Sequence, residues 1–338
     1  MTEVTTAQKT PAIPSRLRAL LAPAALQKLL AFAGLVLLLI FFSLASPSFM
    51  QTDNMINILQ ATAVNGVLAI ASTFVIITGG IDLSVGTLMT FCAVIAGVVL
   101  TFFGLPMWIG LIAALAAGAL CGAVSGTLVA KARIPPFIAT LGMMLLLKGL
   151  SLVISSDKPI YFNDTPGFTA ISQDSLLGEF VPSLPIPNAA MILFLAAILA
   201  SIVLNRTALG RYTFAIGSNE EAVRLSGVNV DRWKIAIYSL GGGICGLAGL
   251  LLASRINSAQ PALGQGYELD AIAAVVIGGT SLAGGAGTIL GTIIGAFIMS
   301  VLTNGLRILS VAQEWQIVVT GVIIIVAVYV DMRLRRQA

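Results

Sequence analysis

Long apolar stretches recur along this chain and limit its fold more than any other feature. A run of about 20 apolar residues can cross the hydrocarbon layer as a helix. Lipid admits only structures that satisfy their own backbone hydrogen bonds. A soluble domain carries about a quarter charged residues, whereas this 338-residue chain has 9% charged and 58% hydrophobic residues. We therefore predict an all-α polytopic membrane protein with about ten transmembrane helices. The expected spans are residues 29–46, 54–77, 84–103, 107–130, 136–154, 189–204, 235–253, 268–279, 288–307 and 314–330.

The positions of the basic residues predict the orientation. Lys and Arg concentrate in cytoplasmic loops. With both termini in the cytoplasm, all of the 18 Lys and Arg residues except four lie on that side. The exceptions are Lys148, Lys158, Arg255 and Arg307. We expect a cytoplasmic tail over residues 1–28, a membrane domain over 29–331 and a cytoplasmic tail over 332–338. Residues 155–188 lie outside, and their five prolines exclude long helices there.

The longest polar interval in the apolar sequence runs from Asn205 to Leu240. Its centre, SNEEAVRLSG, is typical of a short capped helix. Ser218 or Asn219 can be the N-cap, and Gly227 can end the helix. Two turns of helix are unstable alone in water, so this helix needs a surface to lean on. An ordinary loop between two membrane helices is the alternative.

Four stretches together resemble one family of transport proteins. They are EEAVRLSGVNVDRWK, ITGGIDLSVG (residues 77–86), RIPPFIATLGMM (133–144) and SAQPALGQGYELDAIAAVVIGGTSLAGGAGT (258–288). In this order they resemble the permeases of ATP-binding-cassette (ABC) importers, in the branch that takes up ribose and other simple sugars. The resemblance covers residues 51 to 330 and implies the type II importer permease fold, with broken or short helices, in the inner membrane of a prokaryote.

The same resemblance implies partners and a coupling site. Residues 205–234 become a cytoplasmic coupling loop whose helix sits in a groove of a separate ATP-hydrolysing subunit. A periplasmic sugar-binding protein and a second permease copy complete the assembly. The implied coupling residues are Ser218, Asn219, Glu220, Glu221, Ala222, Arg224, Leu225, Ser226 and Gly227.

Two segments do not fit a simple helix bundle. Residues 268–279 would span only about 18 Å as a helix, which is too short to cross the membrane. Glu268 and Asp270 open that helix, where acids complement its dipole. Gly79, Gly80, Asp82 and Ser84 interrupt two spans, and non-helical backbone at membrane depth must be covered by protein or water. Asp82 either N-caps the helix that begins near residue 83 or 84, or carries a proton. GGIDLSVG is echoed by GGTSLAGG (278–285), which is too short to establish a repeat.

Polar side chains in the second span are candidates for a solute path. At 100° per residue they share one arc of the helix, and amides in a membrane helix need partners or water. They either line a path for a neutral sugar or form hydrogen bonds between helices; the four are Asn57, Gln60, Asn65 and Ser72. On the outer side, Lys158, Arg255 and Arg307 are the candidates for docking the binding protein.

Several chemistries lack the residues that they need. The chain has no histidine and three cysteines, Cys92, Cys121 and Cys245, all in apolar segments. We expect no metal site, no cofactor and no enzyme activity, and we expect no nucleic-acid binding. The sequence has no G-x-x-x-x-G-K-[ST] phosphate loop, so a separate chain would bind ATP. Glycines four residues apart, as at Gly118 and Gly122, are typical of close helix packing.

Other transport functions remain open at this point. They are permeases for another pentose or hexose, for autoinducer-like furanoses or for branched-chain amino acids, and an ion-coupled secondary transporter. The last would need ionisable groups within the membrane, and only Asp82 and Lys148 are candidates.

Overall fold

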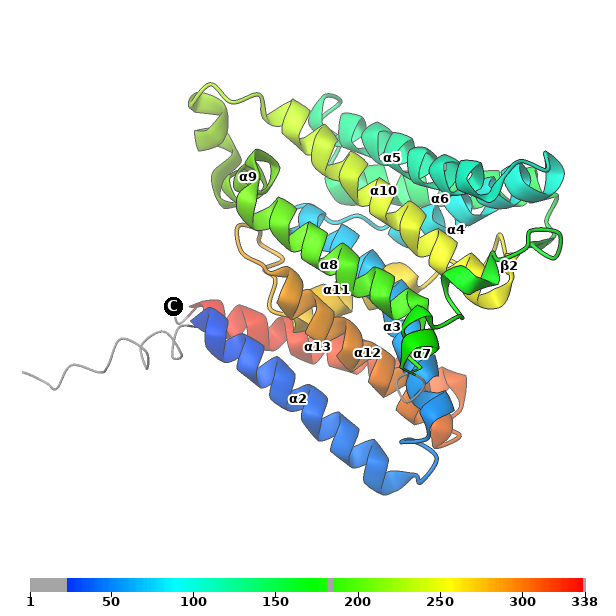
Figure 1. Ribbon diagram of the computed structural model, residues 1–338. Helices are drawn as coiled ribbons and strands as arrows, with labels where there is room; N and C mark the ends of the chain where they lie inside the picture. The colour runs from blue at the N-terminus through cyan, green and yellow to red at the C-terminus, as the bar shows by residue number, and fades with distance from the viewer. Residues whose placement is uncertain (1–22, 182–184, 337–338) are drawn as a thin grey trace, which may run out of the picture.

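A computed structural model describes residues 23–181 and 185–336 of the chain. Its architecture is a bundle of long helices (Figure 1). The long helices are α2 (Pro23–Ala45), α3 (Thr52–Ile77), α4 (Val85–Gly97) with the π-helical turn η1 (Val98–Phe102), α5 (Met107–Ala130), α6 (Pro136–Ser155), α8 (Asn188–Arg206), α9 (Ala208–Leu225), α10 (Val230–Ile256), α12 (Ile289–Ile308) and α13 (Gln313–Arg336). The short elements are β1 (Ile160–Tyr161), η2 (Thr169–Ile171), α7 (Leu176–Phe180), β2 (Ser258–Ala259) and α11 (Tyr267–Ile277).

The helices follow the predicted spans. Within the described ranges, seven helices are long and apolar enough to cross a membrane: α3, α4 with η1, α5, α6, α8, α10 and α12. Two shorter apolar segments, Leu29–Ala45 in α2 and Gln313–Val326 in α13, match the first and last predicted spans. The remaining predicted span is α11, which has 11 residues and is as short as the sequence indicates. The all-α membrane fold is therefore confirmed.

The first and last long helices extend beyond the predicted membrane spans. Helix α2 begins at Pro23 rather than after residue 28, because a proline is well tolerated in the first turn of a helix. Residues 1–22 of the predicted tail lie outside the described residues. At the other end, α13 continues to Arg336, since neither Gly nor Pro interrupts the sequence after residue 331. Residues 337–338 also lie outside the described part.

Helix α3 lies at the centre of the bundle and is buried from Thr62 to Ile77 except at Asn65. Helices α8, α10, α11 and α12 pack around it. Helices α2, α12 and α13 form one side of the bundle in Figure 1, and α5 and α6 form the other. Large apolar side chains are exposed on α2, α5, α6, α8 and α13, as expected of surfaces that face lipid.

Glycines allow the backbones of α5 and α10 to come into direct contact. A Cβ atom on Gly118 would overlap the carbonyl oxygen of Gly242, and one on Gly122 would overlap that of Tyr238. On the other side of the bundle, a Cβ on Gly295 would overlap the carbonyl oxygen of Ala274. Small residues allow backbones in lipid to approach this closely. The predicted packing role of the four-residue glycine spacing is therefore confirmed.

The predicted outer loop contains only short elements in its described part. Strand β1 pairs with β2 in antiparallel register, with Ile160 opposite Ala259. The rings of Phe162 and Phe168 stack with centroids 4.0 Å apart, and both are fully buried. The loop is thereby fixed to the end of α10, as the proline-rich sequence permits.

The glycine-rich echo in the sequence corresponds to two matching turns. After α3, Gly79 donates its backbone N–H to Ile76 and Gly80 donates to Val75. After α11, Gly279 donates to Val276 and Thr280 to Val275. Gly79 and Gly279 have φ of 80° and 90°, a left-handed conformation that glycine adopts without strain. The same turn therefore ends both helices.

Candidate functional site

Helix α9 bends sharply at Asn219, near the centre of the polar interval. Asn219 has extended backbone angles (φ −160°, ψ 95°), so the helix changes direction there. Its side-chain Oδ1 accepts a hydrogen bond from the backbone N–H of Ala222 at 3.0 Å, which caps residues 220–225. Gly227, with φ of 84°, ends the segment. The predicted short helix is confirmed, with Asn219 rather than Ser218 as its N-cap. We call residues 220–225 the elbow helix.

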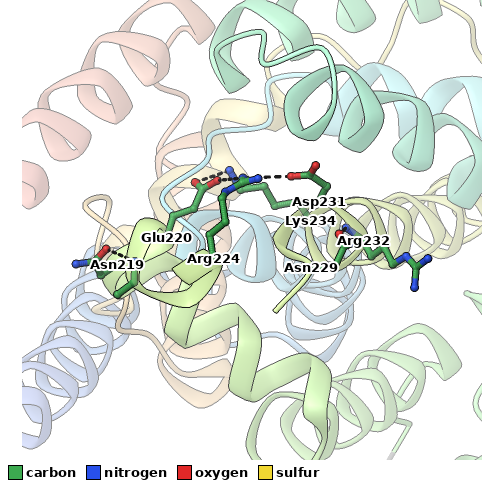
Figure 2. Close-up of polar contacts among 8 residues, drawn as sticks. Asn219, Glu220, Arg224, Asn229, Asp231, Arg232 and Lys234 are labelled. Carbon is green, nitrogen blue, oxygen red and sulfur yellow. Dashed lines mark hydrogen bonds and ion pairs between the residues drawn. The ribbon is translucent and has the colours of Figure 1, made fainter. Parts of the chain in front are cut away.

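Ion pairs join the elbow helix to the start of α10 (Figure 2). Glu220 accepts from Lys234 Nζ at 2.6 Å and from Arg224 Nη2 at 3.1 Å. Arg224 also reaches Asp231 Oδ1 at 3.2 Å. Burial raises the pKa of the Glu220 carboxyl, but the hydrogen bonds and charges of Lys234 and Arg224 outweigh burial, so this pKa lies below its ordinary value. The elbow helix is thus held at a fixed angle to α10.

A groove lies beside the elbow helix. Its volume is about 610 Å³, and its walls include Glu220, Glu221 and Arg224 on one side and residues 133–136 on the other. Two of the four stretches that carry the family resemblance therefore meet here. Leu225, at the end of the elbow helix, is 82% exposed.

The elbow helix connects to the membrane helices through a contact of three backbones. A Cβ on Gly217 would overlap the carbonyl oxygen of Ile77, the last residue of α3. Gly285 donates its backbone N–H to that same oxygen at 2.9 Å. A Cβ on Gly284 would lie 2.9 Å from the backbone nitrogen of Gly79. The part of α9 just before the bend, the end of α3 and the loop before α12 therefore touch without side chains between them. We call this contact the glycine junction.

The predicted role of Asp82 as a helix N-cap is wrong in its position. Helix α4 begins at Val85, and Ser84 occupies the N-cap position without a side-chain cap. Asp82 lies two residues earlier, where Oδ1 accepts from the backbone N–H of Ser84 at 2.8 Å and from its hydroxyl at 2.6 Å. Asp82 therefore closes a local turn between α3 and α4. Between Asp82 and Ser84, the backbone N–H of Leu83 donates to Thr140 Oγ1 on α6 at 3.1 Å.

The four polar residues of the second span do not stay together. Asn57 and Gln60 line a cavity of about 660 Å³. Asn57 and Asn65 line a second cavity, of about 570 Å³, which we call the outer cavity. Ser72 lies deeper in the bundle, 2% exposed, and its hydroxyl has no hydrogen-bond partner among the described residues. The structure thus places three of the four along cavity walls.

Two of the three predicted docking cations also line these cavities. Arg255 is half-buried between both cavities, and Arg307 lines the outer cavity with an exposed side chain. Lys158 lies apart from them, exposed in the outer loop. Lys148, one of the four basic residues that the predicted orientation leaves outside the cytoplasmic segments, donates to Gln265 Oε1 at 2.8 Å.

Sequence reasoning missed much of the outer cavity wall. The additional polar residues come from the ends of several helices and include Asn54, Asp270, Ser300, Thr303, Asn304 and Gln313. Glu268 agrees with the predicted role of acids at the start of this helix, because its carboxylate accepts from the backbone N–H of Gly266, the N-cap of α11. Asp270 instead lines the cavity. Ser300 and Asn304 are four residues apart in an apolar helix, and this spacing was the available signal. The described residues contain no cluster of three His, Cys, Asp or Glu side chains able to hold a metal ion.

Comparisons with known proteins agree on the family. The family model described as the permease component of branched-chain amino acid transport systems matches residues 54–328. The ribose import permease of Escherichia coli strain K12 is 47% identical over 86% of this chain and 88% of its own length. The ribose import permease of Bacillus subtilis strain 168 is 43% identical over 87% and 89%. The fructose import permease of Rhizobium meliloti is 41% identical over 86% and 81%.

No solved structure matches the chain. The family match nevertheless covers most of the sequence and all the helices from α3 to α12. These relatives are transport subunits rather than enzymes. The chain therefore belongs to this family of membrane-embedded import permeases.

Proposed function

We propose that this chain is the transmembrane permease subunit of an ATP-driven importer of ribose or a related simple sugar. The observation that carries the proposal is its 47% identity, over most of both chains, to a ribose import permease. A fructose import permease is 41% identical, so another simple sugar is the alternative substrate. The resemblance noted in the sequence points to the same branch.

A separate subunit supplies ATP hydrolysis and docks on the elbow helix. Three features support this assignment: the elbow helix is preformed, its ion pairs fix its angle to α10, and the side chain of Leu225 is 82% exposed. Burying one leucine contributes about 1.5–3 kcal/mol, which is a useful share of a docking energy. The groove next to residues 133–136 gives the partner a concave surface. The residues assigned to this contact are 218–222 and 224–227.

The glycine junction passes the movement of the elbow to the membrane helices. Gly217 lies two residues before the bend at Asn219 and touches the Ile77 carbonyl directly, so a displacement of the elbow helix that is transmitted through residues 217–219 moves the end of α3. Gly285 is bonded to the same carbonyl, so the loop before α12 moves too. Closure of the ATP-binding subunits thereby changes the arrangement of α3 and α12.

Sugar enters from the opposite end of α3. Asn57, Gln60, Asn65 and Ser72 are assigned to the path, supported by the cavity positions of the first three. A periplasmic binding protein delivers the sugar and contacts Lys158, Arg255 and Arg307. This orientation places both termini and the elbow in the cytoplasm, residues 155–188 in the periplasm, and the chain in a prokaryotic inner membrane beside a second permease copy.

Reconstitution tests the proposal. The permease is purified with its ATP-hydrolysing subunit and inserted into lipid vesicles with the sugar-binding protein on one side. Uptake of labelled ribose is expected only when ATP, both subunits and the binding protein are present, and it persists when an uncoupler removes ion gradients. Uptake by the permease alone, or uptake that stops with the uncoupler while ATP is present, would overturn the proposal. A panel of pentoses and hexoses identifies the preferred sugar.

A further inference from the structure

The outer cavity is a polar chamber formed where five helices end. Its walls come from the beginning of α3, α11 and α13 and the end of α10 and α12. At about 570 Å³ it falls within the usual size of a small-molecule site. Four asparagines line it: Asn54, Asn57, Asn65 and Asn304. So many amides in a membrane protein indicate a polar occupant, because they are costly against apolar surroundings.

Two oxygen atoms in the wall have no hydrogen-bond partner within residues 23–181 and 185–336. Ser300 is 3% exposed, and its hydroxyl is unpaired among the described residues. Asn304, one turn further along α12, donates through Nδ2 to Asn54 at 2.9 Å, but its own Oδ1 is unpaired within the described ranges. A buried polar atom without a partner costs about 1–3 kcal/mol, and native proteins leave few of them. Both atoms are buried behind the wall, so a hydroxyl group in the cavity would reach them only after the Ser300 or Asn304 side chain rotates.

Three charged side chains in the same wall are also available. Arg255, Asp270 and Arg307 line the cavity, and none of them has an ion-pair partner in the part of the chain that the structure describes. Guanidinium groups only donate hydrogen bonds and carboxylates only accept them. The wall therefore presents separate donors and acceptors that do not neutralise one another.

We propose that the outer cavity is a binding site for one molecule of the imported sugar, within the permease itself. Each sugar hydroxyl both donates and accepts, so it can donate to Asp270, accept from Arg255 and Arg307, and do either with the amides of Asn57 and Asn65. The ring of Tyr267 and the side chain of Val64 supply apolar surface for the sugar's C–H groups. This inference rests on the proposed function, and it adds that the permease, and not only the binding protein, selects the solute.

The four asparagines of this wall, rather than its charged groups, favour a neutral polyol over an amino acid. An amino acid carries one carboxylate and one ammonium group, for which the two guanidinium groups and Asp270 offer charged partners. In the described wall, Asp270 is the one carboxylate against two guanidinium groups. The amides have no net charge, and each can both donate a hydrogen bond to a hydroxyl group and accept one from it. Leucine is therefore the appropriate competitor in the test.

Direct binding to the isolated permease tests this site. The full chain, in lipid nanodiscs without binding protein or ATP-hydrolysing subunit, is titrated with tritiated ribose by equilibrium dialysis. Saturable binding in the millimolar range is expected, displaced by unlabelled ribose and not by leucine. Asn57→Ala and Asn304→Leu should each weaken it on the order of tenfold, as expected for a lost hydrogen bond to a bound polar ligand. Asn205→Leu, an exposed asparagine at the other end of the bundle, is the matched control.

The outcomes separate this site from the function on which it rests. Asn57 is exposed, so Asn57→Ala should fold even if Asn304→Leu does not. Absence of ribose binding by a permease that supports uptake in the full importer would overturn the site and leave the function standing. Binding that leucine displaces, or that neither variant weakens, would also overturn it. Ribose binding in a complex that imports no sugar would overturn the function and leave the site.

Discussion

Replacing Gly217 by alanine would place a methyl group inside the glycine junction. The new Cβ would overlap the Ile77 carbonyl oxygen and lie 2.6 Å from the backbone nitrogen of Gly285. Overpacking costs about 1–3 kcal/mol, and loss of the hydrogen bond between Gly285 and Ile77 adds about 0.5–1.5 kcal/mol. The better helix propensity of alanine offsets up to about 1 kcal/mol. The expected net loss is about 2 kcal/mol, or about 4 °C in Tm for a chain of this size.

The same substitution is expected to uncouple ATP hydrolysis from sugar uptake. A change of 1–2 kcal/mol shifts a two-state equilibrium by about 5–30-fold, so the sugar moved per ATP should fall about fivefold or more. The rate of sugar uptake and the rate of ATP hydrolysis are measured in the same vesicles, which contain the complete importer. Gly142→Ala is the matched control, because a Cβ on that glycine of α6 meets nothing within 4 Å. If Gly217→Ala matches this control in Tm and in sugar moved per ATP, the junction does not transmit the movement.

Three further predictions concern the elbow and the helix packing. Glu220→Gln should cost about 1 kcal/mol of stability, since exposed ion pairs contribute little. The pKa of Glu220 is lowered in the folded chain. The stability that the ionised Glu220 contributes is therefore complete above the ordinary carboxyl pKa and is lost as pH falls through the lowered pKa of the folded chain. If Glu220→Gln unfolds with the same pH dependence as the wild type, this prediction is contradicted. Leu225→Asp should leave the permease stable to within about 0.5 kcal/mol while weakening co-purification with the ATP-hydrolysing subunit more than tenfold; unchanged co-purification would exclude Leu225 from the contact. Gly122→Val should cost about 3 kcal/mol, seen as loss of monodisperse protein, because the side chain would overlap the Tyr238 carbonyl, whereas Gly142→Val should behave as wild type.

Local sequence signals predicted most of the helices and the elbow. Apolar runs give the spans because lipid forces helical backbone on them. The elbow helix was visible in its capping residues, Asn219 and Gly227, since capping depends only on near neighbours in the chain. The error at Asp82 has the same origin: an aspartate before a helix can cap it or close a turn, and the sequence alone does not distinguish a shift of two residues.

The outer cavity was only partly predictable, because its residues are far apart in the sequence. Asn57 and Asn65 were identified as amides in an apolar span, but Asp270 was assigned to the helix dipole. For Arg255 and Arg307 the sequence predicts docking of the binding protein rather than a place in a cavity wall. Only the packing of α3, α10, α11 and α12 brings these groups to one wall, and no periodicity in a single helix contains that information.

Helix α3 is a single continuous rod between the two ends of the molecule. It has 26 residues and is therefore about 39 Å long, with Asn57 near its first turn and Ile77 at its last. Neighbouring helices surround its inner half, so bending is restricted and tilting or sliding as a unit is the motion left to it. A displacement of the Ile77 end of α3 is then transmitted to the Asn57 end by the helix itself, without a relay of side chains. The residues of the outer cavity and those of the elbow helix can therefore change independently of each other, provided that α3 stays stiff.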